Sequence, residues 1–308
     1  MRLYTCLESF KEPPLNMKYK ICRGISYLCY IVVSFLENLY IRLVPFFCCR
    51  LNTAPRNEKI IVSLTSYPGR IHIVHLTIKS LMIQTERPDK IILWLYEGQF
   101  PNRILPDKLE KLKRRGLEVR YTSVDYKSHK KYFIALQEQK RDELVITFDD
   151  DIIYDPLCIK RAIETHSHYP NSIVVNQALQ ITVCDGEIGA YSTWHAPTKK
   201  QGSSFKLMPL TGSGCLYPYG VLNECAFDWY TILQTSLSTD DLWIKFVSII
   251  SGTPVVETTP RAKIFTTVYS SQKNHLAITN LAGGGNNNNV QLLISKFPDT
   301  LKVLTNDM

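Results

Sequence analysis

The residues with the clearest chemical meaning are three consecutive carboxylates, Asp149, Asp150 and Asp151, which follow the apolar run at 144–148. A run of this length and β-branched content predicts a buried strand. Adjacent acids at the end of a buried strand repel one another and are costly to desolvate unless positive charge lies between them. A divalent cation held by carboxylate oxygens is the usual source of that charge. The alternative is that Asp149 caps a following turn and the other acids are solvated.

The spacing of these acids suits a metal clamp. On an extended backbone, successive side chains point to opposite faces of a sheet. Asp149 and Asp151 would then share one face, and Asp150 would point to the other. We therefore predict an Asp-x-Asp site for Mn²⁺ or Mg²⁺ with Asp149 and Asp151 as its ligands. His275 is a further candidate ligand, although a single histidine is more often structural.

A second acid pair, Asp240 and Asp241, follows Ser238 and Thr239 and is typical of the start of a helix. Ser or Thr can cap a helix, and acids in its first turn interact favourably with the helix dipole. That is the structural interpretation of the pair. The functional interpretation is that one of the two acids is a general base close to a reacting centre.

The loop after the predicted strand at 59–64 contains Thr65, Ser66, Tyr67 and Arg70. Hydroxyls, an aromatic ring and a guanidinium could bond a ribose, stack on a base and offset a phosphate. The glycine patterns of dinucleotide-binding folds and of P-loops are missing, so neither class is supported. The alternative interpretation of the loop is ordinary turn chemistry.

Two further segments could contact a ligand. Lys127, Lys130 and Lys131 precede or begin a predicted helix, where lysine can bind phosphate as a point charge or can simply be solvated. Gly212 and Gly214 form a glycine-rich turn. Such a turn lets a backbone approach a ligand closely, or it is only a tight loop.

These segments are set in an alternation of strands and helices that begins at residue 58. Strands are predicted at 59–64, 90–95, 117–122 and 144–148, and helices at 73–84, 107–115 and 130–140. This alternation predicts a mainly parallel sheet. Ligands bind outside the carboxyl ends of such strands, so the loop at 65–70 and the acids at 149–151 should share one crevice. The Gly/Asn run at 283–289 is predicted to be a mobile loop.

Composition limits the class of protein. The chain has 308 residues, 45% of them hydrophobic and 21% charged, which fits one large α/β domain or two modest ones. Of the net charge of +8, residues 1–60 contribute +5, from nine Lys/Arg and four Asp/Glu. The main domain therefore offers no basic groove, and no nucleic-acid partner is predicted. The nine cysteines are scattered, with no Cys-x-x-Cys pair, which favours a reducing cytoplasmic compartment over a disulfide framework.

Residues 1–57 form a different kind of segment. Residues 21–42 have a helical period, with polar residues on one stripe and apolar residues elsewhere. The charge-free run at 24–36 is shorter than the ~20 residues that span a bilayer. We predict a basic amphipathic extension at 1–57 and a catalytic domain at 58–308, with residues 21–50 in peripheral contact with the inner face of a membrane. The alternative is a helix packed on the core of the protein itself.

The order of these motifs resembles the GT-A-fold glycosyltransferases of bacterial capsular and cell-surface polysaccharide synthesis. The resemblance covers about residues 59–296 and is most specific at the acid triplet and at Asp-Asp-Leu-Trp, 240–243. It implies a GT-A-like (Rossmann-like) α/β fold, with a mixed, mainly parallel sheet flanked by helices. It also implies a nucleotide-sugar donor, a glycan or lipid-linked acceptor, and Mn²⁺ or Mg²⁺ bridging the donor diphosphate and the Asp-x-Asp motif.

By the same resemblance, the metal and donor-ribose positions fall on Asp149 and Asp151, and the catalytic acid on Asp241 with Asp240 beside it. Residues expected to contact the donor or acceptor are Thr65, Ser66, Tyr67, Arg70, Lys130, Lys131, Asp149, Gly212 and Gly214. An inverting hexosyl transfer needs a base, for which we expect Asp241, kept ionised by the helix dipole. A retaining transfer would not use that base in the same way. The competing functions are a sugar nucleotidyltransferase and a non-catalytic carbohydrate-binding protein.

Overall fold

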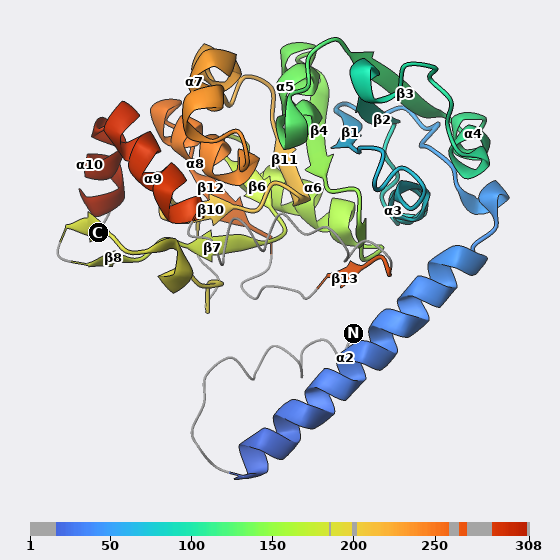
Figure 1. The fold of residues 1–308 in the computed structure, drawn as a ribbon, viewed down its shortest axis with the longest axis horizontal. Coiled ribbons are helices and arrows are strands. Elements are labelled where there is room, and N and C mark those ends of the chain that lie inside the picture. Colours follow the sequence, from blue (N-terminus) through green and yellow to red (C-terminus); the bar gives the residue numbers. More distant parts are fainter. Residues whose placement is uncertain (1–16, 185, 199–201, 259–264, 270–284, 307–308) are drawn as a thin grey trace.

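A computed structural model of the protein describes residues 17–184, 186–198, 202–258, 265–269 and 285–306, with only the backbone described for 17–27 and 306. Within these residues a seven-stranded sheet forms the centre of the molecule, in the order β12-β6-β11-β4-β1-β2-β3 (Figure 1). Its strands are β1 (Lys59–Thr65), β2 (Lys90–Tyr96), β3 (Leu117–Thr122), β4 (Glu143–Phe148), β6 (Ile173–Val175), β11 (Ser213–Tyr217) and β12 (Val255–Glu257).

The sheet is mixed and mainly parallel. Strand β1 is parallel to β2 and β4, β2 is parallel to β3, and β6 is parallel to β12. Strand β11 lies between β4 and β6 and is antiparallel to both. The predicted fold class, a mixed and mainly parallel sheet flanked by helices after an N-terminal helix, is therefore confirmed. The predicted strands at 59–64, 90–95, 117–122 and 144–148 each agree with an observed strand to within one residue.

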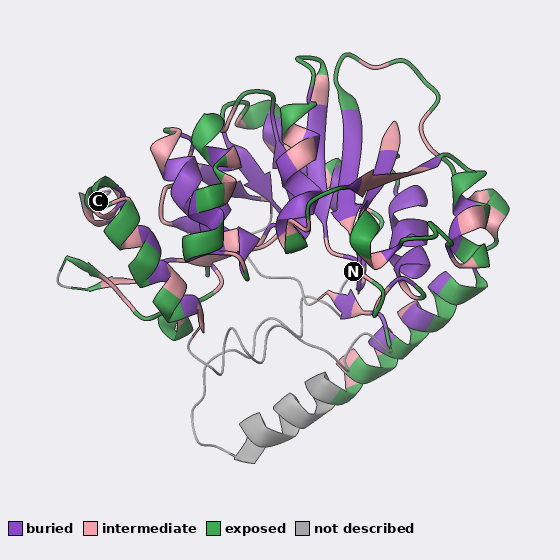
Figure 2. Cartoon of the chain, turned by 45° about the horizontal axis from the view of Figure 1, so that its top comes forward, coloured by how far each residue is buried: buried purple, intermediate pink, exposed green. Residues whose placement is uncertain are grey.

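Alternate side chains of the central strands enter two different cores, as the period of two requires. In β1, Ile60, Val62 and Leu64 pack with α3 (Val74–Met82), α4 (Asp107–Lys113) and α6 (Cys158–His168). On the other face Ile61 packs with α5 (Lys130–Gln137). Helix α8 (Asp240–Ile250) covers the same face near β6 and β11. Figure 2 shows the buried strands between these helices.

The remaining elements surround this sheet. Strand β5 (Ile152–Ile153) pairs with β13 (Thr266–Thr267), β7 (Ala178–Gln180) with β10 (Leu207–Pro209), and β8 (Val183–Cys184) with β9 (Glu187–Ile188). The other helices are α2 (Met17–Leu43), α7 (Trp229–Thr235), α9 (Gly285–Lys296) and α10 (Asp299–Asn306). Short 3₁₀ turns lie at η1 (Phe46–Cys48), η2 (Glu97–Gln99), η3 (Lys127–His129), η4 (Tyr191–Thr193) and η5 (Glu224–Phe227).

The prediction of a mobile loop at 283–289 is wrong for residues 285–289, because helix α9 begins at Gly285. Residues 283 and 284 lie outside the described residues. Contacts with the rest of the protein outweigh the low helix propensity of Gly and Asn. The side chain of Asn286 is buried. Asn287 Oδ1 accepts a hydrogen bond from the backbone N–H of Tyr191 at 2.7 Å. Asn289 donates to the Ser238 hydroxyl at 3.2 Å.

The predicted N-terminal helix is present as α2, which extends along one side of the body and beyond it (Figure 1). Its described end packs on α3, β5 and β13. Among the described residues, no helix has the length and apolar character needed to cross a bilayer. The division at residue 57 into an extension and a catalytic domain, the cytoplasmic location and the peripheral membrane contact stay predictions.

Candidate active site

The glycine turn at 211–214 lies beside the acid triplet because β11 runs antiparallel to β4. Ser213 is in register with Phe148, so the start of β11 meets the end of β4. The Thr147 hydroxyl donates to the Thr211 carbonyl at 2.7 Å, and the Asp149 N–H donates to the Gly212 carbonyl at 3.2 Å. This single antiparallel strand brings the turn to the edge of the sheet where the parallel strands end.

The loop after β1 reaches the same place. Ser66 Oγ donates to Asp150 Oδ2 at 2.6 Å, and Arg70 pairs with Asp150 Oδ1 at 2.8 Å and with Asp151 Oδ2 at 3.1 Å. The prediction that this loop and the acids lie together is confirmed, whereas a crevice for a ligand at this place stays a prediction. The physical reason is that β1 and β4 are adjacent parallel strands whose carboxyl ends meet at one edge.

The predicted alternation of the three acids is wrong. The strand ends at Phe148 and the backbone bends before β5 begins, so the acids do not continue an extended strand. Asp150 and Asp151 share Arg70, whereas Asp149 pairs with Lys131 Nζ at 2.8 Å. Basic side chains therefore provide positive charge that the sequence had suggested a metal would supply.

Lys131 connects the two groups of acids. Its Nζ lies 2.8 Å from Asp149 Oδ1 and 2.9 Å from Asp240 Oδ2, and its side chain is only 3% exposed. Burial alone would lower the pKa of Lys131, but the neighbouring carboxylates raise it above its ordinary value. The ammonium is therefore charged and holds Asp149 and Asp240 on either side of it. Lys131 lies in the first turn of α5, which packs against β1 and β4.

The second acid pair is organised by Thr211. Its hydroxyl lies 2.5 Å from Asp240 Oδ2 and 2.6 Å from Asp241 Oδ1, and its backbone N–H donates to Asp241 Oδ1 at 2.7 Å. A hydroxyl has one proton, so it can donate to only one of the two carboxylates at a time. Predicted capping by Thr239 is not seen: Thr239 occupies the N-cap position of α8 without a side-chain capping bond.

The two acids have opposite protonation behaviour. Burial disfavours the charged form of Asp240, but Lys131 outweighs it and holds the pKa of Asp240 well below its ordinary range. Burial and then the charge of Asp240 raise the pKa of Asp241. The expected effect of the helix dipole on Asp241 is therefore outweighed by its neighbours. Of the pair, Asp240 is the fixed anion and Asp241 is the group able to take up a proton closest to neutral pH.

Gly212 is the position against which the Asp149 carboxylate rests. A Cβ built on Gly212 would lie 2.0 Å from Asp149 Oδ2, which no side chain can occupy without moving the carboxylate. Gly214 has a different role, because its φ of +94° lies in the left-handed region that favours glycine, and a Cβ there would meet Phe148 at 2.8 Å. Gly212 therefore belongs to the acid cluster, by which we mean the carboxylates at 149–151 and 240–241 with Lys131 and Arg70. Gly214 instead serves the conformation and packing of β11.

Replacing Gly212 by Ala is expected to displace Asp149 from Lys131 and to reduce binding of the nucleotide-sugar donor predicted from the sequence at least about tenfold, the effect of losing about 1.4 kcal/mol. The matched control is Gly202→Ala, where the nearest atom to a new Cβ is 3.9 Å away. Isothermal titration with nucleotide sugars and thermal unfolding of both variants check this. Equal donor binding by the two variants would contradict the role of Gly212.

Several predicted ligand residues have other contacts. The Lys130 ammonium pairs with Asp125 at 2.5 Å and not with the acid cluster, because it is one position from Lys131 on α5 and points elsewhere. The Thr65 hydroxyl donates to the Trp94 carbonyl at 2.9 Å. The Tyr67 ring lies under the Arg70 guanidinium, 5.8 Å from its centre. His275 lies outside the described residues.

A metal ion would need ligands from the substrate as well as from the chain. No group of three or more His, Cys, Asp and Glu able to hold a metal is found among the described residues. Magnesium is commonly bound by one or two carboxylates together with substrate phosphates, and the half-exposed carboxylate of Asp149 is the group here that suits such a site. The Asp149 side chain is 45% exposed and accessible, while Asp151 is 11% exposed and paired with Arg70.

Two residues of the cluster were not singled out from the sequence. Thr211 bonds both acids of α8, and the Tyr154 hydroxyl accepts a bond from the Asp149 N–H at 2.9 Å and donates to the Gly212 carbonyl. Both are next to motifs that were singled out: Thr211 precedes the glycines, and Tyr154 closes the Ile-Ile-Tyr step after the acids. The sequence signal that could have identified these two residues was a hydroxyl next to a segment already predicted to belong to the site.

No protein-family model matches the chain, and no curated protein matches it. Among solved structures, 4-diphosphocytidyl-2C-methyl-D-erythritol synthase from Anaerococcus prevotii is 13% identical, with 73% of this chain and 96% of that chain covered and a TM-score of 0.41. The 2-C-methyl-D-erythritol 4-phosphate cytidylyltransferase of Francisella tularensis is 16% identical, covering 73% and 99%, with a TM-score of 0.42. Residues 1–349 of S. aureus TarS are 11% identical, covering 66% and 59%, with a TM-score of 0.40.

Proposed function

We propose that the protein is a metal-dependent glycosyltransferase that moves a sugar from a nucleotide-sugar donor to a glycan or lipid-linked acceptor in cell-surface polysaccharide synthesis. The observation that carries this proposal is the bridge made by Lys131 between Asp149, at the end of β4, and Asp240, at the start of α8. The aspartate proposed to bind the metal and the aspartate pair proposed to contain the general base are thus connected through one lysine. The motif order shared with GT-A-fold glycosyltransferases supports the same assignment.

On the donor side, the exposed carboxylate of Asp149 is the proposed contact with a Mn²⁺ or Mg²⁺ ion that is completed by the donor diphosphate, with Asp151 as the second carboxylate. When bound, the cation offsets the charge that develops on the leaving nucleoside diphosphate. Lys131 and Arg70 hold these carboxylates at the strand edge. Burial raises the pKa of Asp151 to about 6, so the binding of a cation is expected to favour its ionised form.

On the acceptor side, Asp241 is the proposed general base of an inverting transfer. It takes the proton of the acceptor hydroxyl as that oxygen bonds to the sugar carbon. A base is most effective when its pKa is close to the working pH, and burial beside Asp240 raises the pKa of Asp241 in that direction. Thr211 orients the Asp241 carboxylate through its N–H and its hydroxyl.

The competing reaction is that of a sugar nucleotidyltransferase, which joins a nucleoside triphosphate to a sugar phosphate and releases pyrophosphate. That reaction needs no base for an acceptor hydroxyl. The loop at 65–70, with a single glycine, lacks the glycine-rich character expected of such an enzyme. The acid pair at 240–241 therefore favours glycosyl transfer.

The test is to incubate the full chain with a panel of nucleotide sugars, Mn²⁺ and glycan or lipid-linked acceptors, and to measure free nucleoside diphosphate. We expect release from one donor class. The Asp151→Asn variant should lose turnover while it remains folded by circular dichroism. Asp142→Asn is the matched control, because Asp142 is an exposed aspartate paired only with surface Lys59 in the described structure.

Two outcomes would contradict the proposal. Activity that survives both Asp151→Asn and an excess of chelator would exclude the metal role. Release of pyrophosphate from a nucleoside triphosphate and a sugar phosphate, with no release of diphosphate from nucleotide sugars, would identify a nucleotidyltransferase instead.

A further inference from the structure

Helix α2 packs on the protein through its polar residues. Asn38 is 1% exposed; its Nδ2 donates to the Thr267 carbonyl at 3.0 Å, and its Oδ1 accepts from the Tyr269 N–H at 2.9 Å. The Glu37 carboxylate accepts a bond from the Thr266 hydroxyl. Ser34 is also buried. The polar stripe seen in the sequence therefore faces the body of the protein, not the solvent.

The apolar side of α2 is exposed as a consequence. Exposed side chains recur at spacings of three and four residues, which places them on one side of the helix. Among them Phe35 is 54% exposed and Leu43 is 70% exposed. The set consists of Leu28, Ile31, Val32, Phe35, Leu36, Leu39, Tyr40 and Leu43. Figure 2 shows the exposed side of the helix. A continuous apolar face of this kind marks a site of interaction.

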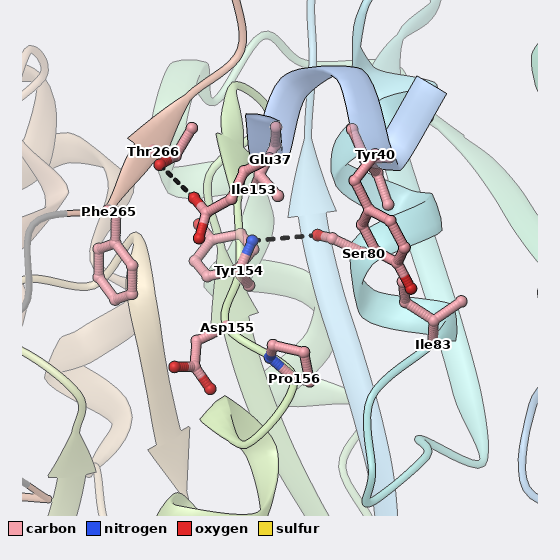
Figure 3. A pocket seen from close by; sticks show the side chains of 11 residues that line it. Glu37, Tyr40, Ser80, Ile83, Ile153, Tyr154, Asp155, Pro156, Phe265 and Thr266 are labelled. Atoms are coloured by element: carbon pink, nitrogen blue, oxygen red, sulfur yellow. Dashed lines mark hydrogen bonds between the residues drawn. The ribbon is translucent and has the colours of Figure 1, made fainter. Parts of the chain in front are cut away.

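Two hollows border the end of this face. One, of about 170 Å³, lies between α2, α3 and β5, where Tyr40 and Ile83 face the segment around Tyr154 (Figure 3). The other, of about 350 Å³, is lined by apolar side chains that again include Tyr40 and Ile83, with the exposed cation Arg87 among them. The apolar walls of the second hollow, beside Arg87, suit a lipid chain with an anionic headgroup, whereas the first hollow is also lined by the carboxylates of Glu37 and Asp155.

The net charge of the N-terminal segment favours an anionic membrane over a second copy of the chain as the partner of this apolar face. Residues 1–60 have a net charge of +5 (nine Lys/Arg and four Asp/Glu), and Arg42 and Arg50 are exposed close to Leu43 in the chain. A second copy of the chain would bring a segment of the same positive charge against the first. An anionic bilayer is complementary to these cations, and juxtamembrane Lys and Arg each contribute about 1 kcal/mol to such binding.

We propose that the apolar face of α2 docks on an anionic membrane surface, with its apolar side chains in the headgroup–acyl boundary and Arg42, Arg50 and Arg87 at the headgroups. This docking goes beyond glycosyl transfer and does not depend on the reaction that the enzyme performs. It requires only the exposed helix face and its cations.

The docked helix has a short connection to the acid cluster. Strand β13, which α2 holds through Asn38, pairs with β5, and the Val268 N–H donates to the Asp151 carbonyl at 2.7 Å. The acids therefore lie at a defined position relative to the membrane-facing helix. If the enzyme is the proposed glycosyltransferase, this geometry suits an acceptor whose lipid anchor is in the same bilayer.

Vesicle flotation of the full chain without nucleotide sugar tests the docking. We expect flotation with phosphatidylcholine vesicles that contain phosphatidylglycerol, and much less with phosphatidylcholine alone. The double variant Phe35→Glu/Leu39→Glu should lose binding at least about tenfold, since each apolar side chain buried is worth more than about 1.4 kcal/mol. The matched control, Ile104→Glu/Leu233→Glu, alters two exposed apolar residues far along the chain from α2 and should bind normally.

A charge variant makes the test independent of any folding defect. Arg42→Glu/Arg50→Glu changes two exposed residues and should weaken binding to anionic vesicles while the circular dichroism spectrum is unchanged. Light scattering of the wild type is the companion measurement. A dimer that the Phe35→Glu/Leu39→Glu change dissociates, with no vesicle binding, would overturn the proposal in favour of a second copy. Equal flotation of all variants would also overturn it. Neither result bears on donor turnover, which is measured separately.

Discussion

Replacing Lys131 by Met is expected to abolish sugar transfer and to lower the free energy of unfolding by about 3–5 kcal/mol, the usual cost of removing one partner from a buried ion pair. The Lys131 side chain is 3% exposed and pairs with both Asp149 and Asp240. Without the ammonium, Asp240 loses the cation that pairs with it and is left as a buried anion, and Asp149 and Asp240 repel each other. Asp149, on the proposed donor side, and Asp240, on the proposed acceptor side, are then no longer held in place.

The neighbouring lysine provides a matched control for this change. Lys130 is equally buried, at 3% exposed, but pairs with Asp125. Lys130→Met should therefore reduce stability while the remaining folded protein keeps its turnover. Urea denaturation and release of nucleoside diphosphate, measured on both variants at a temperature where both are folded, separate the two effects. If Lys131→Met keeps a wild-type rate, the bridge has no part in catalysis.

Replacing Asp241 by Asn is expected to slow transfer ~10²–10⁴-fold, the usual contribution of a general base, with little change in donor affinity. The amide keeps the shape of the side chain but cannot take a proton from an acceptor hydroxyl. Asp149 and Asp151 are left in place on the donor side. Single-turnover transfer rates and donor titrations of the wild type and the variant measure the two quantities separately.

The pH dependence of the rate gives a second measurement of the same role. A base must be deprotonated, so the rate should fall as the pH drops through the raised pKa of Asp241. Asp240→Asn removes the negative neighbour that helps to raise the pKa of Asp241. The charge of Lys131, which lowers the pKa of Asp241, remains. The acid limb of the Asp240→Asn profile should therefore move to lower pH, even if its maximal rate is reduced.

The two acids exchange roles if Asp240→Asn is inactive while Asp241→Asn transfers at close to the wild-type rate. A different result, in which neither change matters, would make the start of α8 structural only. The enzyme would then use another base or retain configuration at the sugar carbon. The exposed variant Asp142→Asn serves as the control for both substitutions.

The sequence alone was sufficient for four strands of the sheet, β1 to β4, and for the closeness of the loop at 65–70 to the acid triplet. The runs that form β1 and β4 are long, apolar and bounded by turn residues, and this pattern depends on local chemistry. Parallel strands end at one edge, so the sequence also placed the loop at 65–70 beside the acids at 149–151, as the Arg70–Asp150 pair confirms. The metal and the base were suggested by residue types, and the donor by the resemblance to GT-A-fold glycosyltransferases; all three stay predictions.

Only the tertiary structure decided which charges are paired. Lys130 and Lys131 are adjacent in the sequence, yet about 100° of helix rotation separates them, so one bonds Asp125 and the other the acid cluster. The antiparallel strand β11, which brings Thr211 and Gly212 to the site, left no clear pattern in the sequence. The orientation of α2 is a further case, because a helical period separates a polar side from an apolar side but does not say which one faces the protein. That choice depends on the partners that β13 offers to Asn38, and such contacts between residues far apart in the chain have no local signal.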